Sequence, residues 1–283
     1  MNVYRKLRRF VAKQLGYLAA KMEPFSSQDD LSKFKGYYSD AVEDASTIRL
    51  TRNGHTITLR KASSDLMVFE QLFIYKEYSE LVDLIRLNKI SIRTVIDLGA
   101  NIGLATIYLR ENFPDATFIC AEPDERNFES LQANLSGYDK TVLYQKAIWS
   151  TQKNIYLNRN FRDGKDWAIS VSNNKSGSYA EVNTMTIDEI ILHNNLDEID
   201  LIKIDIEGAE AELFKGSEQN DFLDKVKVIA IEIHNEFNVR DSIISQLINH
   251  NFLLVESKQT LVAISASCIQ NSMNHVTNNQ SVI

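Results

Sequence analysis

Residues 95–103 read Val-Ile-Asp-Leu-Gly-Ala-Asn-Ile-Gly, and this stretch decides the fold of the chain. It begins with the β-branched and apolar residues of a strand that is buried in a sheet. Gly99 and Gly103 then remove side chains where we expect the backbone to pass close to a ligand, and helical spacing starts at Leu104. Because a helix that opens from such a loop presents unpaired N–H groups and a positive dipole end, the stretch predicts a ligand site between a strand and a helix.

Two acidic residues mark the predicted strands around this loop. Asp97 lies just before the glycines, and Glu122 closes the following strand, 117–122, where the hydroxyls of a ribose would be bound. The spacing Gly-x-x-x-Gly differs from the Gly-x-Gly-x-x-Gly of dinucleotide sites. The pattern instead resembles S-adenosylmethionine-dependent methyltransferases with a Rossmann-like sheet. The alternative is a glycine-rich turn that binds no ligand.

Composition limits the class of protein. A chain of 283 residues with only three prolines and ten glycines predicts one compact domain with a short N-terminal appendage. The net charge of −7 argues against a nucleic-acid partner, because phosphate recognition needs a basic surface. Two cysteines, Cys120 and Cys268, are too few for a disulfide scaffold. With neither a signal peptide nor an apolar run of about 18 residues, we expect a cytoplasmic protein.

Residues 1–22 differ from the rest of the chain in charge. They carry six Lys or Arg and no acid, and their apolar residues repeat at helical spacing. Such a basic amphipathic helix can lie on an anionic membrane surface as a peripheral contact. The alternative is a helix that packs its apolar stripe on the main domain or on a second copy of the chain, as in a homo-oligomer.

The order of elements predicts the architecture. A hairpin over 48–59 with Asn53-Gly54 at its turn and a helical region over 65–87 precede the core. Strands and helices then alternate, with a polar segment over 150–180 and a strand near 181–185, as in a doubly wound α/β sheet of seven strands. The last strand should be antiparallel, because its link is too short for a crossover. The predicted strands are 93–98, 117–122, 141–148, 181–185, 200–206, 226–233, 252–256 and 260–265. The predicted domains are an extension over 1–64, a methyltransferase domain over 65–267 and a disordered tail over 268–283.

Two of these strands carry polar residues on one face. Alternation places Lys203, Asp205 and Glu207 on the same side of one strand, and Glu232 and His234 on the same side of its expected neighbour. Buried charges must be paired or directed at a ligand. We therefore expect Lys203 to meet Glu232 as a structural ion pair, and Asp205 to approach His234 at the carboxyl ends of the strands, where open α/β sheets bind substrates.

This second pair is the candidate catalytic group. Asp205 or His234 would accept the proton of a substrate hydroxyl, since a histidine beside a carboxylate titrates in the useful range. The alternative is that the pair only shapes the pocket. Asp205, Glu207 and His234 are also ligand types for a divalent ion. Because nothing in the sequence sets their spacing, we expect no metal.

Several motifs together resemble the FkbM-type methyltransferases, over residues from about 65 to 235. The resemblance implies an S-adenosylmethionine-dependent O-methyltransferase that acts on hydroxyls of natural products, sugars or glycans. The motifs are Val95-Ile-Asp-Leu-Gly-Ala-Asn-Ile-Gly103, Phe118-Ile-Cys-Ala-Glu-Pro-Asp124, Leu131-Gln-Ala-Asn134, Thr186-Ile-Asp188 and Asp200-Leu-Ile-Lys-Ile-Asp-Ile-Glu-Gly-Ala-Glu210.

The resemblance also implies roles for single residues. The glycine loop would line the methionine and ribose of the cofactor, Glu122 would bind the ribose hydroxyls, and residues 147–149 would lie near the adenine. Asp205 would lie beside the reactive methyl group. Beyond the motifs, Arg159, Arg162 and Trp167 would suit a sugar or an anionic acceptor, or would be plain surface. The candidate cofactor-binding residues are Asp97, Gly99, Asn101, Gly103, Glu122, Ala147 and Trp149.

Three other functions remain open at this point. A nicotinamide-dependent oxidoreductase is disfavoured by the glycine spacing. A hydrolase is disfavoured because no Gly-x-Ser-x-Gly elbow occurs in the chain. The third is a catalytically silent cofactor-binding or scaffold protein, attached to a membrane through residues 1–22.

Overall fold

A computed structural model describes residues 31–158, 170–172, 178–215, 220–234 and 239–269. Three predictions fall outside these residues: the basic helix of 1–22, the side chains of Arg159, Arg162 and Trp167, and the tail from Asn271. None of the described helices is both long enough and apolar enough to cross a membrane.

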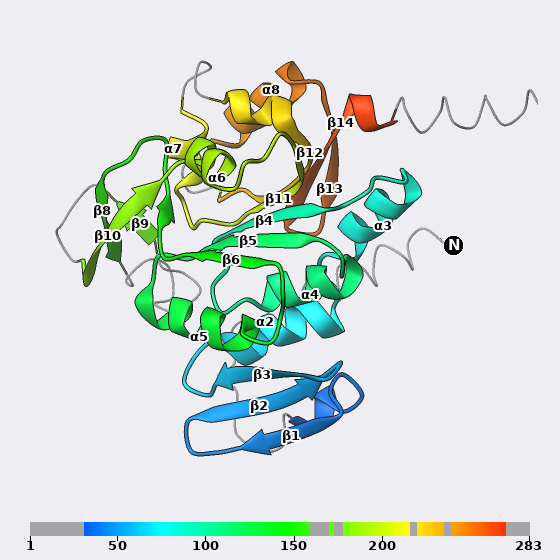
Figure 1. Cartoon of the computed structure of the whole chain (residues 1–283), viewed down its shortest axis with the longest axis vertical. Coiled ribbons are helices and arrows are strands. Elements are labelled where there is room, and N and C mark those ends of the chain that lie inside the picture. The colour runs from blue at the N-terminus through cyan, green and yellow to red at the C-terminus, as the bar shows by residue number, and fades with distance from the viewer. Residues whose placement is uncertain (1–30, 159–169, 173–177, 216–219, 235–238, 270–283) are drawn as a thin grey trace, which may run out of the picture.

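The centre of the molecule is a mixed sheet of seven strands in the order β13-β14-β12-β11-β4-β5-β6 (Figure 1). The predicted Rossmann-like α/β sheet is confirmed, and its last strand is antiparallel to both neighbours. That strand, β14, lies between β12 and β13, because only two residues separate it from β13 and the pair forms a hairpin. The strands are β4 (Thr94–Leu98), β5 (Thr117–Ala121), β6 (Thr141–Tyr144), β11 (Ile199–Ile204), β12 (Val226–Glu232), β13 (Phe252–Ser257) and β14 (Thr260–Ser265).

Helices cover both faces of this sheet (Figure 1). Alternate residues of the strands point to opposite faces, so Leu201 and Val228 join one hydrophobic cluster while Ile202 and Ile229 join the other. The first cluster packs against α2 (Asp65–Phe69), α3 (Ser79–Leu87), α4 (Leu104–Asn112) and α5 (Glu125–Leu135). The second packs against α6 (Ile187–His193), α7 (Glu210–Leu213), the 3₁₀ segment Asp221–Lys225 and α8 (Arg240–Asn249).

The predicted N-terminal hairpin is present and has a third strand. It consists of β2 (Thr47–Arg52) and β3 (His55–Arg60) around the Asn53-Gly54 turn, with β1 (Asp40–Glu43) antiparallel to β2. Its apolar face belongs to the same hydrophobic cluster as α4 and α5. Asn134 of α5 also joins it to the domain, since its amide accepts from the N–H of Thr58 at 2.7 Å and donates to the carbonyl of Ile102 at 2.9 Å. The boundary predicted at residue 64 is not tested by this packing.

A smaller sheet contains the predicted strand near 181–185, the end of the predicted strand 141–148, and two strands that were not predicted. The predicted strand 141–148 ends at Tyr144, and β7 (Ala147–Ile148) pairs instead with β10 (Ala180–Met185). The polar segment 150–180 contains two further strands, β8 (Asn154–Asn158) and β9 (Ser170–Ser172). The order of this sheet is β7-β10-β8-β9, and it lies to one side of the central sheet (Figure 1).

Candidate active site

The glycine loop connects β4 to α4, and neighbouring protein atoms leave no room for a side chain at either glycine. Gly99 has a φ of +77°, and a Cβ there would lie 1.8 Å from the carbonyl oxygen of Asp205. Gly103 has a φ of +88°, and its Cβ would lie 2.8 Å from Leu131 of α5. The expectation that these glycines make room for a ligand is therefore incomplete, because the closest neighbours of both are protein atoms. Gly99 nevertheless borders the pocket described below.

Glu122 holds the loop from the end of β5. Its carboxylate accepts hydrogen bonds from the N–H groups of Asn101 at 2.9 Å and Asp124 at 3.0 Å. Only 5% of Glu122 is exposed, and burial raises the pKa of its carboxyl to about 7 although these hydrogen bonds lower it. The predicted ribose-binding acid is thus a buried carboxyl that borders the pocket.

Asp97 does not border the pocket, because it is fully buried below the loop. It accepts a hydrogen bond from Thr106 at 2.6 Å and forms an ion pair with Lys203 at 3.1 Å. The ammonium of Lys203 also donates to the carbonyl of Gly99 at 2.8 Å. The predicted pairing of Lys203 with Glu232 is wrong, since the register sets Lys203 beside Asp97 on β4 and beside Ala230, not Glu232, on β12.

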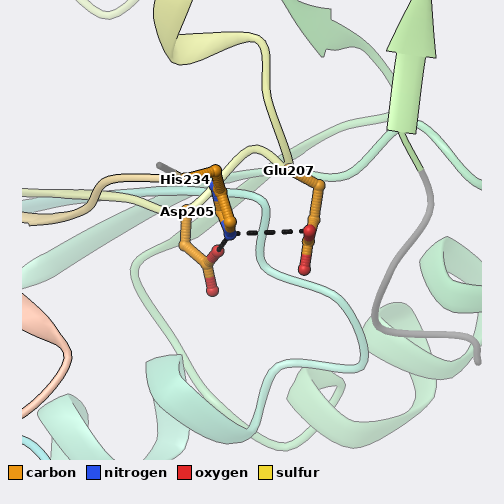
Figure 2. A group of neighbouring side chains, drawn as sticks. All are labelled: Asp205, Glu207 and His234. Atoms are coloured by element: carbon orange, nitrogen blue, oxygen red, sulfur yellow. Dashed lines mark ion pairs between the residues drawn. The ribbon is translucent and has the colours of Figure 1, made fainter. Parts of the chain in front are cut away.

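The predicted approach of Asp205 to His234 is confirmed (Figure 2). Asp205 and Glu207 follow β11, His234 follows β12, and the two strands are parallel neighbours. The Nε2 atom of His234 lies 3.9 Å from Asp205 and 3.5 Å from Glu207, while its Nδ1 atom lies 2.8 Å from the fully buried Glu210. Three carboxylates of the Asp205–Glu210 segment thus surround the ring of His234.

The charges at this point decide which group can accept a proton. Burial lowers the pKa of His234, but the hydrogen bond and charge of Glu210 outweigh it and raise the pKa to about 9. Burial and the negative charge of Asp205 raise the pKa of Glu232 to about 8. At neutral pH His234 therefore carries a proton, so Asp205 is the better base of the two candidates.

One pocket joins these parts. Five of the predicted site residues line it: Gly99, Asn101, Glu122, Ala147 and Asp205. Four do not: Asp97, Gly103, Trp149 and His234.

The two candidate residues predicted to lie near the adenine, Ala147 and Trp149, differ in whether they reach the pocket. Trp149 is 3% exposed and packs with Ala147, Ile155 and Ala209, with the ammonium of Lys153 4.5 Å from its ring centre. Trp149 is therefore part of the core, whereas Ala147 reaches the pocket.

Sequence reasoning missed several polar residues of the pocket. Glu77 and Tyr78 come from the turn after the π-helical segment Glu70–Ile74, Gln259 from the β13–β14 link, and Glu232 from the end of β12. Only Glu232 had a signal, as a charged residue in an apolar strand. The others lie in segments without a motif and reach the site through the path of the chain.

Other motif residues hold the fold. Thr186 forms a capping box with Glu189 at the start of α6, and Asp124 caps α5 by accepting from the N–H of Asn127. The carboxylate of Asp200 accepts from the backbone N–H groups of Arg93 and Thr94 at 2.7 and 2.9 Å, which joins the start of β4 to β11. These residues explain why the motifs extend beyond the pocket.

Known proteins resemble this chain in sequence. The model of the methyltransferase FkbM domain matches residues 97–254, more than half of the chain. The 2-O-methyltransferase NoeI of Sinorhizobium fredii is 26% identical over 192 residues, covering 63% of this chain and 73% of that protein. The 31-O-demethyl-FK506 methyltransferase FkbM of Streptomyces tacrolimicus is 22% identical over 257 residues, covering 80% of this chain and 94% of that protein.

Solved structures overlap it more loosely. A precorrin-6y C5,15-methyltransferase from Geobacter metallireducens GS-15 matches with a TM-score of 0.37 and 13% identity, covering 66% of this chain and 88% of that chain. The fold assignment rests on the strand order of the central sheet.

Proposed function

Because this chain belongs to the FkbM methyltransferase family and is a methyltransferase, we propose that it transfers the methyl group of S-adenosylmethionine to a hydroxyl oxygen. The names of both relatives place the methyl group on oxygen, one as a 2-O-methyltransferase and one as a methyltransferase of a 31-O-demethyl compound. We take the acceptor to be a sugar, a glycan or a natural product that presents a free hydroxyl.

The observation that carries the proposal is the shared pocket of the glycine loop, Glu122 and Asp205. The loop and Glu122 line the pocket together with the acidic residues at the ends of β11 and β12. The side-chain oxygen of Asn101 in the pocket wall is buried and accepts no hydrogen bond from any described residue, so it offers an acceptor to a polar ligand. The carboxylates of Asp205, Glu207 and Glu232 in the same lining suit a positively charged sulfur.

The residues divide the work of the reaction between them. When bound, S-adenosylmethionine supplies a methyl carbon on a sulfonium sulfur, and the electrons of the broken C–S bond remain on that sulfur. Asp205 accepts the proton of the acceptor hydroxyl as its oxygen bonds to the methyl carbon. Glu122, Asn101 and Ala147 hold the nucleoside, and Lys203 keeps the loop and Asp205 in place. Alignment and exclusion of water supply most of the acceleration.

Two variants test this division. We expect Asp205→Ala to lose methyl transfer while it still binds S-adenosylhomocysteine, because Asp205 acts on the acceptor. We expect Glu122→Ala to lose binding of S-adenosylhomocysteine first. Calorimetry measures the binding, and transfer of a tritiated methyl group to a panel of sugar, glycan and natural-product acceptors measures the activity. Loss of binding in Asp205→Ala alone would reverse the two assignments, and no binding by the wild type would exclude the proposed donor.

A further inference from the structure

His234 is oriented like a histidine that binds a metal ion. Its Nδ1 atom lies 2.8 Å from Glu210, which is fully buried and also accepts from the N–H of Gly208 at 2.9 Å. Since an ionised carboxylate only accepts, Nδ1 carries a hydrogen and Nε2 is directed away from Glu210. A metal ion that binds Nε2 would displace the proton that this nitrogen carries at neutral pH in the metal-free protein. A carboxylate that holds the far nitrogen of a histidine is the usual outer partner of a metal-binding imidazole.

The other ring nitrogen is buried without a hydrogen bond. Among the described residues, nothing forms a hydrogen bond with Nε2 of His234, although the residue is only 2% exposed. Figure 2 shows this atom directed at the carboxylates of Asp205 and Glu207. One ligand atom from each of the three residues lies within 4.8 Å of the other two.

We propose that Asp205, Glu207 and His234 bind a divalent transition-metal ion at the edge of the pocket, with Glu210 as the residue that positions the imidazole. The sequence led us to expect no metal, because it does not reveal how far apart these residues lie. The structure supplies that distance.

The distances are compatible with one ion. At metal–ligand bonds of about 2.1 Å, two ligands lie about 3.0 to 3.4 Å apart in octahedral or tetrahedral geometry. His234 Nε2 is 3.5 Å from Glu207 and 3.9 Å from Asp205, so these two distances would shorten by about 0.1 to 0.9 Å when an ion binds. The ligand atoms of Asp205 and Glu207 lie within 4.8 Å of each other and would move closer by at most about 1.8 Å. One imidazole with two carboxylates favours Mn²⁺, Fe²⁺, Co²⁺ or Zn²⁺ over ions that prefer oxygen alone.

Among the residues that the structure describes, the lysine beside Asp205 does not take the place of this ion. Lys203 faces the second oxygen of Asp205 at 3.7 Å and is nearer to Asp97, at 3.1 Å. The oxygen of Asp205 that faces His234 is the other one. The ion would therefore bind on the side of Asp205 that is away from Lys203.

The location of the site indicates what the ion would do. Asp205 and Glu207 both line the pocket, and three protein ligands leave coordination positions for a ligand. This part of the inference rests on the proposed function: an acceptor hydroxyl on the ion would be aligned with the methyl group and would lose its proton more readily.

The test measures metal binding without donor or acceptor. Full-length protein is treated with chelator and titrated with MnCl₂, followed by calorimetry and by the electron paramagnetic resonance signal of free Mn²⁺. We expect one Mn²⁺ per chain, and at least tenfold weaker binding in His234→Gln and in the more exposed Glu207→Gln. Glu210→Gln should weaken binding about 10- to 100-fold. The electron spin echo of bound Mn²⁺ should show a nitrogen coupling that disappears in His234→Gln.

A surface histidine–carboxylate pair provides the matched control. Nδ1 of His250 lies 2.7 Å from Asp224, and neither residue lines the pocket, so His250→Gln should bind Mn²⁺ like the wild type. Circular dichroism confirms that each variant is folded.

Two results would overturn the metal site: no saturable binding of Mn²⁺ or Zn²⁺ by the wild type, or binding that is unchanged in folded His234→Gln and Glu207→Gln. Binding of S-adenosylhomocysteine to the chelated protein is measured separately. If that binding persists without metal binding, only the metal inference fails; metal binding without nucleoside binding would count against the proposed function alone.

Discussion

Replacing Gly99 by alanine should destabilise the protein far more than the same change at Gly54. Both glycines have a left-handed backbone, with φ of +77° and +82°. They differ in their surroundings. A Cβ at Gly54 meets nothing within 4 Å, whereas a Cβ at Gly99 would lie 1.8 Å from the carbonyl oxygen of Asp205. The pair therefore separates the cost of the backbone conformation from the cost of the collision.

The magnitude follows from what must move. The left-handed conformation costs an alanine about 1 kcal/mol at either position. At Gly99 the two backbone segments must also separate by about 1.2 Å to reach the 3.0 Å that real contacts require. That shift strains the hydrogen bonds from Asp205 N–H to Leu98 at 3.1 Å and from Lys203 to Gly99 at 2.8 Å, each worth about 1 to 1.5 kcal/mol. We expect a loss of about 1 kcal/mol for Gly54→Ala and about 4 kcal/mol for Gly99→Ala.

Urea unfolding followed by circular dichroism measures both variants. A difference of about 3 kcal/mol corresponds to a midpoint of thermal unfolding that is about 6 to 12 °C lower for Gly99→Ala than for Gly54→Ala. Folded Gly99→Ala should also transfer methyl groups poorly, because the displaced segment carries Asp205. Free energies of unfolding that agree within 1 kcal/mol for the two variants would refute the reasoning, since the collision would then cost nothing.

Three further predictions concern stability. Because the pKa of Glu122 is raised to about 7, the folded state keeps a proton that the unfolded chain releases near pH 4.5, so the free energy of unfolding should fall as pH rises from 4.5 to 7. In urea unfolding, the free energy of the wild type minus that of Glu122→Gln should fall by about 2 to 3 kcal/mol over this range. A difference that does not change with pH would contradict the prediction. Lys203→Met leaves Asp97 buried without its partner and should lower the free energy of unfolding in urea by about 3 to 5 kcal/mol. The double variant with Asp97→Asn should recover part of this loss. Equal losses of stability in the single and double variants would count against the ion pair. Asn134→Ala removes hydrogen bonds to Thr58 and Ile102 and should lower the free energy of unfolding by about 2 to 3 kcal/mol. A protease should also cleave the hairpin faster in this variant. An unchanged rate of cleavage would show that other contacts hold the hairpin in place.

The sequence itself determines the strands and the hairpin turns of this protein. Apolar runs predicted strands at the positions of all seven central strands, although the run 141–148 extends past the end of β6 and the predicted strand near 181–185 belongs to the smaller sheet. Asn53-Gly54 predicted a hairpin, and its turn has φ of 50° and 82°. The short link after β13 also required an antiparallel last strand. These features depend only on residues near one another in the chain, which is why the order of residues is enough to predict them.

Contacts between distant segments were decided only by the tertiary structure. The register of β11 against β4 pairs Lys203 with Asp97, and no sequence pattern contains that register. Gly99 is required by the backbone of Asp205, more than a hundred residues away. The path of the chain around the Asp205–Glu210 segment likewise sets the distances among Asp205, Glu207 and His234. The residue types in the sequence indicate which chemistry is available, but the packing of strands and loops determines which side-chain atoms lie close enough to one another to perform it.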